Sequence, residues 1–263
     1  LPILESTTLK MADAIIAVSE GTKADILQHF DVDPHKVHVI YNGIDLAEYR
    51  RTEAPDVLRK HGVDPDKPYV LFVGRIARQK GIVHLVRAIQ HLDPGFQVVL
   101  CAGAPDTIEI KEEMEAAVAA ASKVRPGVIW VQAMLPLQEK IVMYSHADVF
   151  CCPSIYEPFG IINLEAMACE TAVVASAVGG IKEVVVDGET GILVPLEQQT
   201  ESPFEAMHPE KFARDLAAGI NKLMADPTLR NRMAQAGRQR AEDHFSWKSI
   251  ARKTLALYKT LAV

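Results

Sequence analysis

Short apolar runs alternate with helix-like segments along most of the 263-residue chain. Several of these runs are apolar or small at nearly every position instead of every second one: 69–74, 96–103, 127–132, 148–154 and 171–176. Continuous runs of this length are typical of parallel strands that helices cover on both faces. Because the connections between them are short, the pattern predicts an α/β fold with a doubly wound parallel sheet and right-handed crossovers.

The remaining segments complete this alternation. Further strands are predicted at three places: 13–19, 36–45 and 191–195. Helices are predicted near 20–30, 54–62, 81–92, 107–122, 137–147 and 160–170, with three more after residue 208. Between the last strand and these closing helices, 196–210 is predicted to be one long polar loop.

Composition excludes several classes of partner and site. The 28 basic and 34 acidic residues give a net charge of −6, so no general attraction to nucleic acid or to an anionic membrane is expected. No apolar run approaches the roughly 20 residues of a membrane span, and the opening LPILESTT has neither a basic leader nor an initiator Met. We therefore expect a cytoplasmic location and a chain that is part of a longer protein.

The cysteines give no sign of a disulfide scaffold or a metal site. There are four, Cys101, Cys151, Cys152 and Cys169, and none belongs to a CxxC pair. In a chain of this size they are expected to be buried, reduced thiols. No metal site is predicted.

Ligands of doubly wound sheets lie beyond the carboxyl ends of the strands, so the strand-to-helix loops are the places to search. In VGRIARQKG, Gly74 closes a strand, Arg75 follows it and Lys80 precedes the next helix. Two cations beside a helix N-terminus are typical of a phosphate or diphosphate site. A solvated loop is an equally good interpretation of this stretch alone, which matches neither the dinucleotide fingerprint nor the P-loop.

A second loop, SIYEPFGIINLEA, has an acid near each end. Glu157 follows a strand, the amides of Gly160, Ile161 and Ile162 open a helix, and Glu165 lies further along that helix. First-turn amides without intrahelical partners suit an anion. The helix around Glu165 is apolar on nearly every side, so this carboxylate needs a partner, either an ion pair or ribose hydroxyls. Glu157 is either a helix-dipole acid or a group that touches a sugar.

Two further loops carry weaker signals. Gly103, in CAGAPDT, allows close backbone approach at a strand end, as glycines do in many α/β folds. The glycines of GGIKEVVVDGETGILV are explained by turn chemistry.

Taken together, the loops resemble the nucleotide-sugar half of the retaining GT-B glycosyltransferases. EPFGIINLE matches their E-x7-E pattern, GRIARQKG their G-R-x4-K-G diphosphate clamp, and GGIKEVVVDGETGILV their glycine-rich tail, with Ile192 where Leu is more usual. Finer similarity, in CAGAPDT and in the stretch 155–191, is to bacterial glycogen synthases of the actinobacterial kind and extends over essentially the whole chain. The resemblance implies transfer of glucose from ADP-glucose or UDP-glucose to an α-1,4-glucan, with retention and without a metal or other cofactor.

The resemblance also implies roles for individual residues. Arg75 and Lys80 would hold the diphosphate, Glu157 would stand at the donor sugar, and Glu165 would bind the ribose. The other positions implied to contact the nucleotide sugar are Gly74, Gly103, Gln132, Ala133, Met134, Phe159, Gly160, Ile161 and Ile162. The family's sugar-contacting His has no counterpart here, since His84, His91 and His146 are interpreted as ordinary helix residues.

The implied domain organisation is incomplete. Residues 1–45 resemble the last strand and helix of an otherwise absent acceptor-binding N-terminal domain, with its hinge, and 46–245 the nucleotide-sugar domain. Residues 246–263 would cross back to the absent domain, which would leave Trp247 and Tyr258 exposed. The chain is thus expected to bind the donor but to be inactive alone, with the glucan acceptor held by the absent domain.

Two alternatives stay open, and a third is disfavoured. One is another hexosyltransferase, or an epimerase, with the same donor fold, and another is a nucleotide-sugar binding module without chemistry. An NAD oxidoreductase is disfavoured because its glycine fingerprint is missing. The base of the nucleotide, the acceptor and the oligomeric state are not determined by these patterns.

Overall fold

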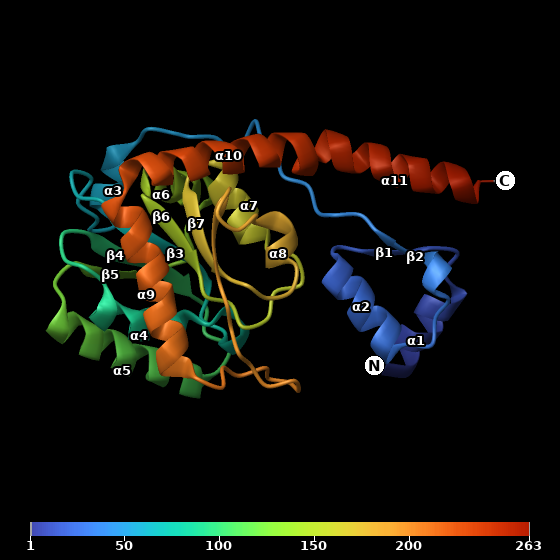
Figure 1. Ribbon diagram of the computed structural model, residues 1–263, viewed down its shortest axis with the longest axis horizontal. Coiled ribbons are helices and arrows are strands. Elements are labelled where there is room, and N and C mark those ends of the chain that lie inside the picture. The colour runs from blue at the N-terminus through green and yellow to red at the C-terminus, as the bar shows by residue number, and fades with distance from the viewer. Residues whose placement is uncertain (1, 263) are drawn as a thin grey trace.

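The computed structural model describes residues 2–262 and has a six-stranded parallel sheet at its centre (Figure 1). The strands run in the order β5-β4-β3-β6-β7-β8. Their bounds are β3 Tyr69–Arg75, β4 Gln97–Gly103, β5 Val128–Val131, β6 Val149–Cys152, β7 Ala172–Ser176 and β8 Gly191–Val194. The chain starts this sheet in the middle at β3, builds outward to β5, then returns to β6 and builds the other side. This is the predicted doubly wound fold, and its crevice for ligands lies where the order reverses, between β3 and β6.

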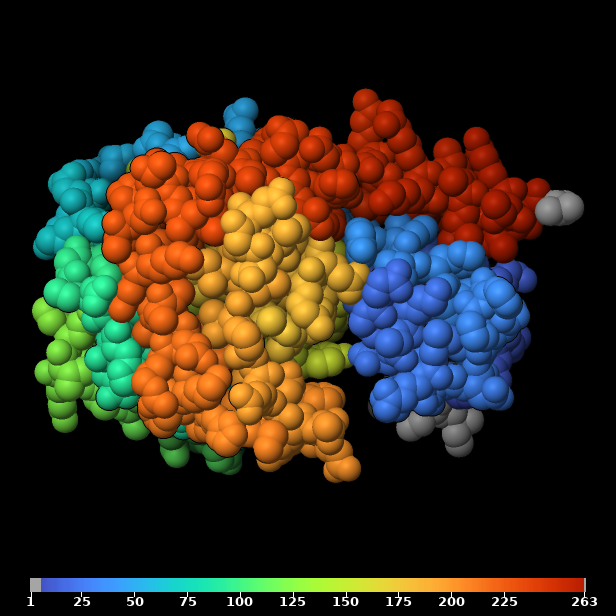
Figure 2. Space-filling view, in the orientation of Figure 1, coloured from blue at the N-terminus to red at the C-terminus, as the bar shows by residue number. Residues whose placement is uncertain are grey.

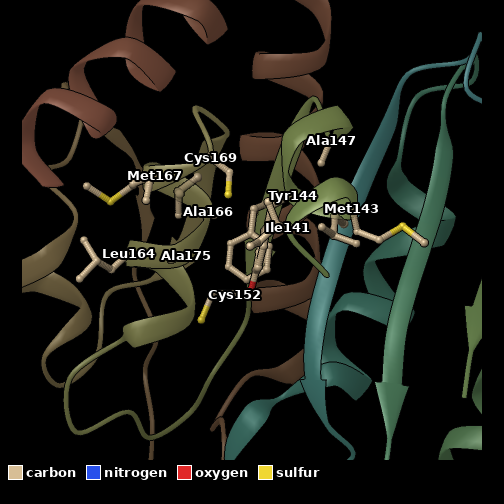
Figure 3. Packing of buried hydrophobic residues seen from close by; sticks show 14 of the residues in the cluster. Ile141, Met143, Tyr144, Ala147, Cys152, Leu164, Ala166, Met167, Cys169 and Ala175 are labelled. Carbon is tan, nitrogen blue, oxygen red and sulfur yellow. The ribbon is translucent and has the colours of Figure 1, made fainter. Parts of the chain in front are cut away.

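Helices cover both faces of the sheet and create two cores. On one face, Val70 and Phe72 of β3 belong to a cluster with α4 (Ile82–Ala88), α5 (Ile108–Val124) and α9 (Pro209–Ala225). On the other face, Leu71 joins a cluster with α3 (Pro55–Lys60), α6 (Leu137–His146), α7 (Ile161–Ala168), α8 (Ile181–Val184) and α10 (Pro227–Phe245). Figure 3 shows part of this second core, where side chains of α6 and α7 lie with Cys152 of β6 and Ala175 of β7. Strands β4, β6 and β7 are buried at every position, which explains their continuous apolar sequences.

Residues 2–39 form a small unit of their own (blue in Figure 1). It consists of α1 (Pro2–Met11), β1 (Ile15–Ala17), α2 (Glu20–His29), the 3₁₀ turn η1 (Pro34–Lys36) and β2 (Val37–Val39). The two strands pair in parallel, and Ile15, Ala17 and Val37 make a separate core. The predicted strand at 36–45 was too long, because β1 offers only three residues to pair with. The strands predicted at 13–19 and 36–45 and the helix predicted near 20–30 are β1, β2 and α2, to which the structure adds α1.

The N-terminal unit (blue in Figure 2) contacts the main domain at the loop that carries Glu157 and at Glu183 of α8. The Ser19 hydroxyl donates to the Pro158 carbonyl at 2.6 Å. The carboxylate of Glu183 accepts from the backbone amides of Glu20 and Gly21, which open α2. The position of this loop is therefore fixed partly from outside the main domain.

The chain closes with α11 (Trp247–Leu261), which extends from α10 past the N-terminal unit (Figures 1 and 2). Trp247 and Tyr258 are exposed on it, as the sequence predicted. Within residues 2–262, no helix combines the length and the hydrophobicity needed to cross a membrane. All four cysteines are buried and unpaired, as predicted.

Candidate functional site

A cavity of about 240 Å³ opens at the carboxyl end of β3, where the strand order reverses. Residues from β3, β4, the β5–α6 loop, α6 and α7 line it: Val73, Gly74, Arg75, Lys80, Cys101, Ala133, Met134, Leu135, Lys140, Ile162 and Glu165. It therefore lies where a doubly wound sheet binds its ligand.

The two cations of the first loop lie at this cavity in different surroundings. The Arg75 guanidinium lies 2.7 Å from an oxygen of Asp106, and their side chains are 52% and 37% exposed. The Lys80 ammonium lies 2.7 Å from Oε2 of Glu157, where the side chains are only 17% and 7% exposed. Exposed ion pairs contribute little, so Arg75 is free to exchange Asp106 for another anion, whereas Lys80 is held in place.

Glu157 is held in its loop by close backbone packing. Its Oε2 accepts from Lys80 and, at 3.4 Å, from Ser154, and its Oε1 accepts nothing from the residues that the structure describes. A Cβ on Gly179, which has φ +46°, would lie 2.1 Å from the Glu157 carbonyl oxygen. A Cβ on Gly81, which has φ +60°, would lie 2.0 Å from the Pro153 carbonyl oxygen. Glycine is therefore needed at both positions because the backbone there lies against the Glu157 loop. For Gly179 this is a reason in addition to the turn chemistry that the sequence predicted.

Glu165, on α7, accepts hydrogen bonds from three side chains of the protein. Its Oε1 accepts from the Tyr49 hydroxyl at 2.7 Å and the Lys140 ammonium at 2.8 Å, and its Oε2 accepts from the Tyr144 hydroxyl at 3.0 Å. The partner that this buried carboxylate was predicted to need is therefore supplied by the protein. Burial, followed by the nearby Glu165 charge, raises the pKa of both Tyr49 and Tyr144, so both phenols remain protonated donors.

The N-terminus of α7 faces the same region. Gly160 precedes the helix with φ +105°, and the amides of Ile161 and Ile162 belong to the first turn, which has no intrahelical acceptor for them. Ile162 also lines the cavity. The Phe159 side chain is instead buried between the rings of Tyr41 and Phe245, where it anchors the loop.

The cavity brings together most, though not all, of the predicted residues. Those that line it are Gly74, Arg75, Lys80, Ala133, Met134, Ile162 and Glu165. Glu157 reaches it only through Lys80, and the others do not line it: Gly103, Gln132, Phe159, Gly160 and Ile161. Gly103 has a different reason to be glycine, because a Cβ there would lie 2.4 Å from the Gln132 carbonyl oxygen.

Sequence reasoning missed Val73, Cys101, Leu135 and Lys140, which also line the cavity. Burial raises the pKa of the Cys101 thiol to about 12, so it is not a thiolate nucleophile. His84 is buried against Phe212, and burial lowers its pKa to about 4, which keeps the imidazole neutral. Across the described part of the chain, no group of three or more His, Cys, Asp or Glu side chains is arranged to hold a metal ion.

Comparison with known proteins assigns the chain to a family. Residues 54–240 match the model of glycosyl transferases group 1, and residues 2–48 match that of Glycosyltransferase Family 4. The chain belongs to the group 1 glycosyl transferases. This confirms the broader family that the three motifs indicated.

The relatives refine this assignment. An alpha-maltose-1-phosphate synthase from Mycolicibacterium smegmatis is 48% identical over 263 residues, which cover 98% of this chain and 66% of the relative. The chain thus spans about two thirds of that relative's length. The relative carries the name of a maltose-1-phosphate synthase, not of the glycogen synthase that the sequence motifs predicted.

Two solved structures resemble the fold closely. A sucrose-phosphate synthase from Thermosynechococcus elongatus is 31% identical, with a TM-score of 0.80 over 99% of this chain and 61% of its own. Anabaena Alr3699/HepE, solved in complex with UDP-glucose, is 21% identical, with a TM-score of 0.82 over 98% of this chain and 67% of its own. The second likeness shows the fold alone.

Proposed function

We propose that this chain is the donor-binding part of a glucosyltransferase that takes glucose from ADP-glucose or UDP-glucose. The observation that carries the proposal is the cavity at the reversal of strand order, whose wall has three cations, Arg75, Lys80 and Lys140, and a single carboxylate, Glu165. A positively lined cavity beside a helix N-terminus suits a diphosphate. A related fold was solved with UDP-glucose bound, which is consistent with this class of donor.

Transfer of the glucose requires that positive groups neutralise the charge of the departing nucleoside diphosphate. Arg75 and Lys80 supply fixed positive charge for this purpose, and the first-turn amides at Ile161 and Ile162 add oriented dipoles. One carboxylate oxygen of Glu157 has no partner among the described residues, and it is available to a hydroxyl of the donor sugar. We further propose that transfer proceeds with retention and without a metal, as the motif resemblance implies.

Two acceptors are compatible with this donor site. The motif resemblance implies elongation of an α-1,4-glucan. The name of the 48% identical relative favours the second, glucose 1-phosphate, because a maltose 1-phosphate product requires that a glucosyl residue be joined to it. We place acceptor binding outside this chain in either case.

Activity assays separate these possibilities. The protein that carries this chain, including the N-terminal part its relatives possess, is incubated with ADP-glucose or UDP-glucose and with either glucose 1-phosphate or a maltooligosaccharide. A disaccharide phosphate product supports glucose 1-phosphate as the acceptor, and a lengthened glucan supports glycogen synthase-like activity. Donor binding without any transfer would leave a nucleotide-sugar binding module and contradict the proposal.

A further inference from the structure

Lys140 lies in the wall of the cavity although no sequence motif contains it. It belongs to the first turns of α6, and its side chain is 22% exposed. Its ammonium lies 2.8 Å from Oε1 of Glu165 and 3.1 Å from the Tyr49 hydroxyl. An ammonium has three N–H groups, and within residues 2–262 only two of them have acceptors. One donor of Lys140 is therefore left at the cavity.

Glu165 complements this donor. A carboxylate has about four lone-pair sites. Three of those on Glu165 are occupied by Tyr49, Lys140 and Tyr144, and the remaining one is on Oε2. Both Lys140 and Glu165 line the cavity. The wall thus offers one hydrogen-bond donor next to one acceptor.

This pairing selects among the parts of a nucleotide sugar. A diphosphate has only acceptors, so it would leave the free lone pair of Glu165 unused. A vicinal diol has both functions, because one hydroxyl can donate to Glu165 while its neighbour accepts from Lys140. The ribose and the glucose of a nucleotide sugar both present such diols. Because the proposed function places the glucose at Glu157, the diol left for Lys140 and Glu165 is that of the ribose.

Resting on the proposed function, we propose that Lys140 is a specificity-determining residue that binds one hydroxyl of the donor's ribose diol while Glu165 binds the other. Lys140 then has two tasks. It neutralises and orients the Glu165 carboxylate, and it contacts the ligand directly. A purely orienting role, shared with Tyr49, is the alternative that an experiment must separate.

The experiment measures dissociation constants of the 263-residue chain by calorimetry. The ligands are ADP, or UDP if that binds more tightly, and its 2′-deoxy and 3′-deoxy analogues. For the unaltered chain, loss of a hydroxyl is expected to weaken binding about tenfold, as for a hydrogen bond to a charged group. Lys140→Met should bind the parent nucleotide about tenfold more weakly and lose most of this discrimination for one of the two analogues.

Two matched variants interpret that result. Tyr49→Phe removes the other donor to Oε1 without changing any charge, and discrimination should survive. Arg75→Ala should weaken all three ligands by the same factor, because it acts on the diphosphate. Lys140→Ala, which has no side-chain donor, provides the same comparison if the methionine variant does not fold, as judged from unfolding midpoints without ligand.

Four outcomes would overturn the proposal. Equal weakening of all three ligands in Lys140→Met would assign Lys140 to the diphosphate, and unchanged affinity would remove it from the site. Equal loss of discrimination in Lys140→Met and Tyr49→Phe would mean that Lys140 acts only through Glu165. If the unaltered chain binds neither ADP nor UDP, the donor site itself fails, and the proposed function fails with it.

Discussion

The two acids of the EPFGIINLE motif are buried to a similar extent, yet they lie in different surroundings. Glu157 is in a loop and pairs with Lys80 at 2.7 Å, and Glu165 is in a helix and pairs with Lys140 at 2.8 Å. Beyond these lysines, Glu165 accepts from two tyrosine hydroxyls, whereas Glu157 has only Ser154 at 3.4 Å.

This difference separates a carboxylate that protein donors hold in position from one that has an oxygen available to a ligand. Three donors fix Glu165 and leave it a single free lone pair, so its position is set before any ligand arrives. In the part of the chain that the structure describes, Oε1 of Glu157 has no protein partner, and its loop is kept in place by backbone contacts with Gly179 and Gly180. One motif thus contains a carboxylate with three protein donors and a carboxylate with one oxygen that no described residue contacts by a hydrogen bond.

The largest expected effect concerns turnover. In the complete transferase, Glu157→Gln should lower kcat about a thousandfold, as for other groups that stabilise a transition state. Glu165→Gln should instead weaken nucleotide binding about tenfold, with kcat at saturating donor nearly unchanged. Steady-state kinetics together with direct nucleotide binding would check both. Similar losses of kcat in the two variants would remove the distinction between the acids.

Stability should depend on the glycine beneath the Glu157 loop. Gly81→Ala combines a left-handed backbone with a Cβ 2.0 Å from the Pro153 carbonyl oxygen, and we expect it to lower the free energy of unfolding by about 4 kcal/mol. Gly62→Ala is a matched control, since Gly62 has φ +77° and nothing within 4 Å, and it should cost about 1 kcal/mol. Urea unfolding measures both. Equal costs for Gly81→Ala and Gly62→Ala would show that the backbone at Gly81 does not pack against Pro153 as closely as the structure has it.

Lys80 and Lys140, which pair with the two acids, should differ in how much they contribute to the free energy of unfolding. Lys80→Met leaves Glu157 buried with one distant donor, and it should destabilise the chain by about 3 kcal/mol. Lys140→Met leaves Glu165 with two tyrosine hydroxyls, and it should cost only about 1.5 kcal/mol. Chemical unfolding at neutral pH compares them, with Lys60→Met as a surface control expected within about 0.5 kcal/mol of the unaltered chain. A larger cost for Lys140→Met than for Lys80→Met would reverse the comparison.

The sequence predicted the features that depend on local patterns, namely the buried strands and the motif loops. It did not predict contacts between residues that are far apart in the chain. The continuous apolar runs indicated β3, β4, β6 and β7 because full burial leaves no polar face. The motif loops placed Arg75, Lys80 and Glu165 at one edge of the sheet because all parallel strands end there.

The environment of Glu165 had no local signal. Its donors come from a connecting segment before α3, which carries Tyr49, and from α6, which carries Lys140 and Tyr144. Neither segment contains a recognisable motif. Likewise, the need for glycine at 81 arises from Pro153, which is far away in the sequence.

The smallest expected effects test the hydroxyl donors. Tyr144→Phe removes a fully buried donor from Glu165 and should lower the free energy of unfolding by about 1.5 kcal/mol, since the carboxylate oxygen it leaves is charged. Ser154→Ala removes a donor that is 3.4 Å from Glu157 and should cost only about 0.5 kcal/mol. Thermal and urea unfolding together resolve a difference of this size. If Ser154→Ala were as costly as Tyr144→Phe, Glu157 would be held as firmly as Glu165, and its free oxygen would no longer mark it as the group that meets the sugar.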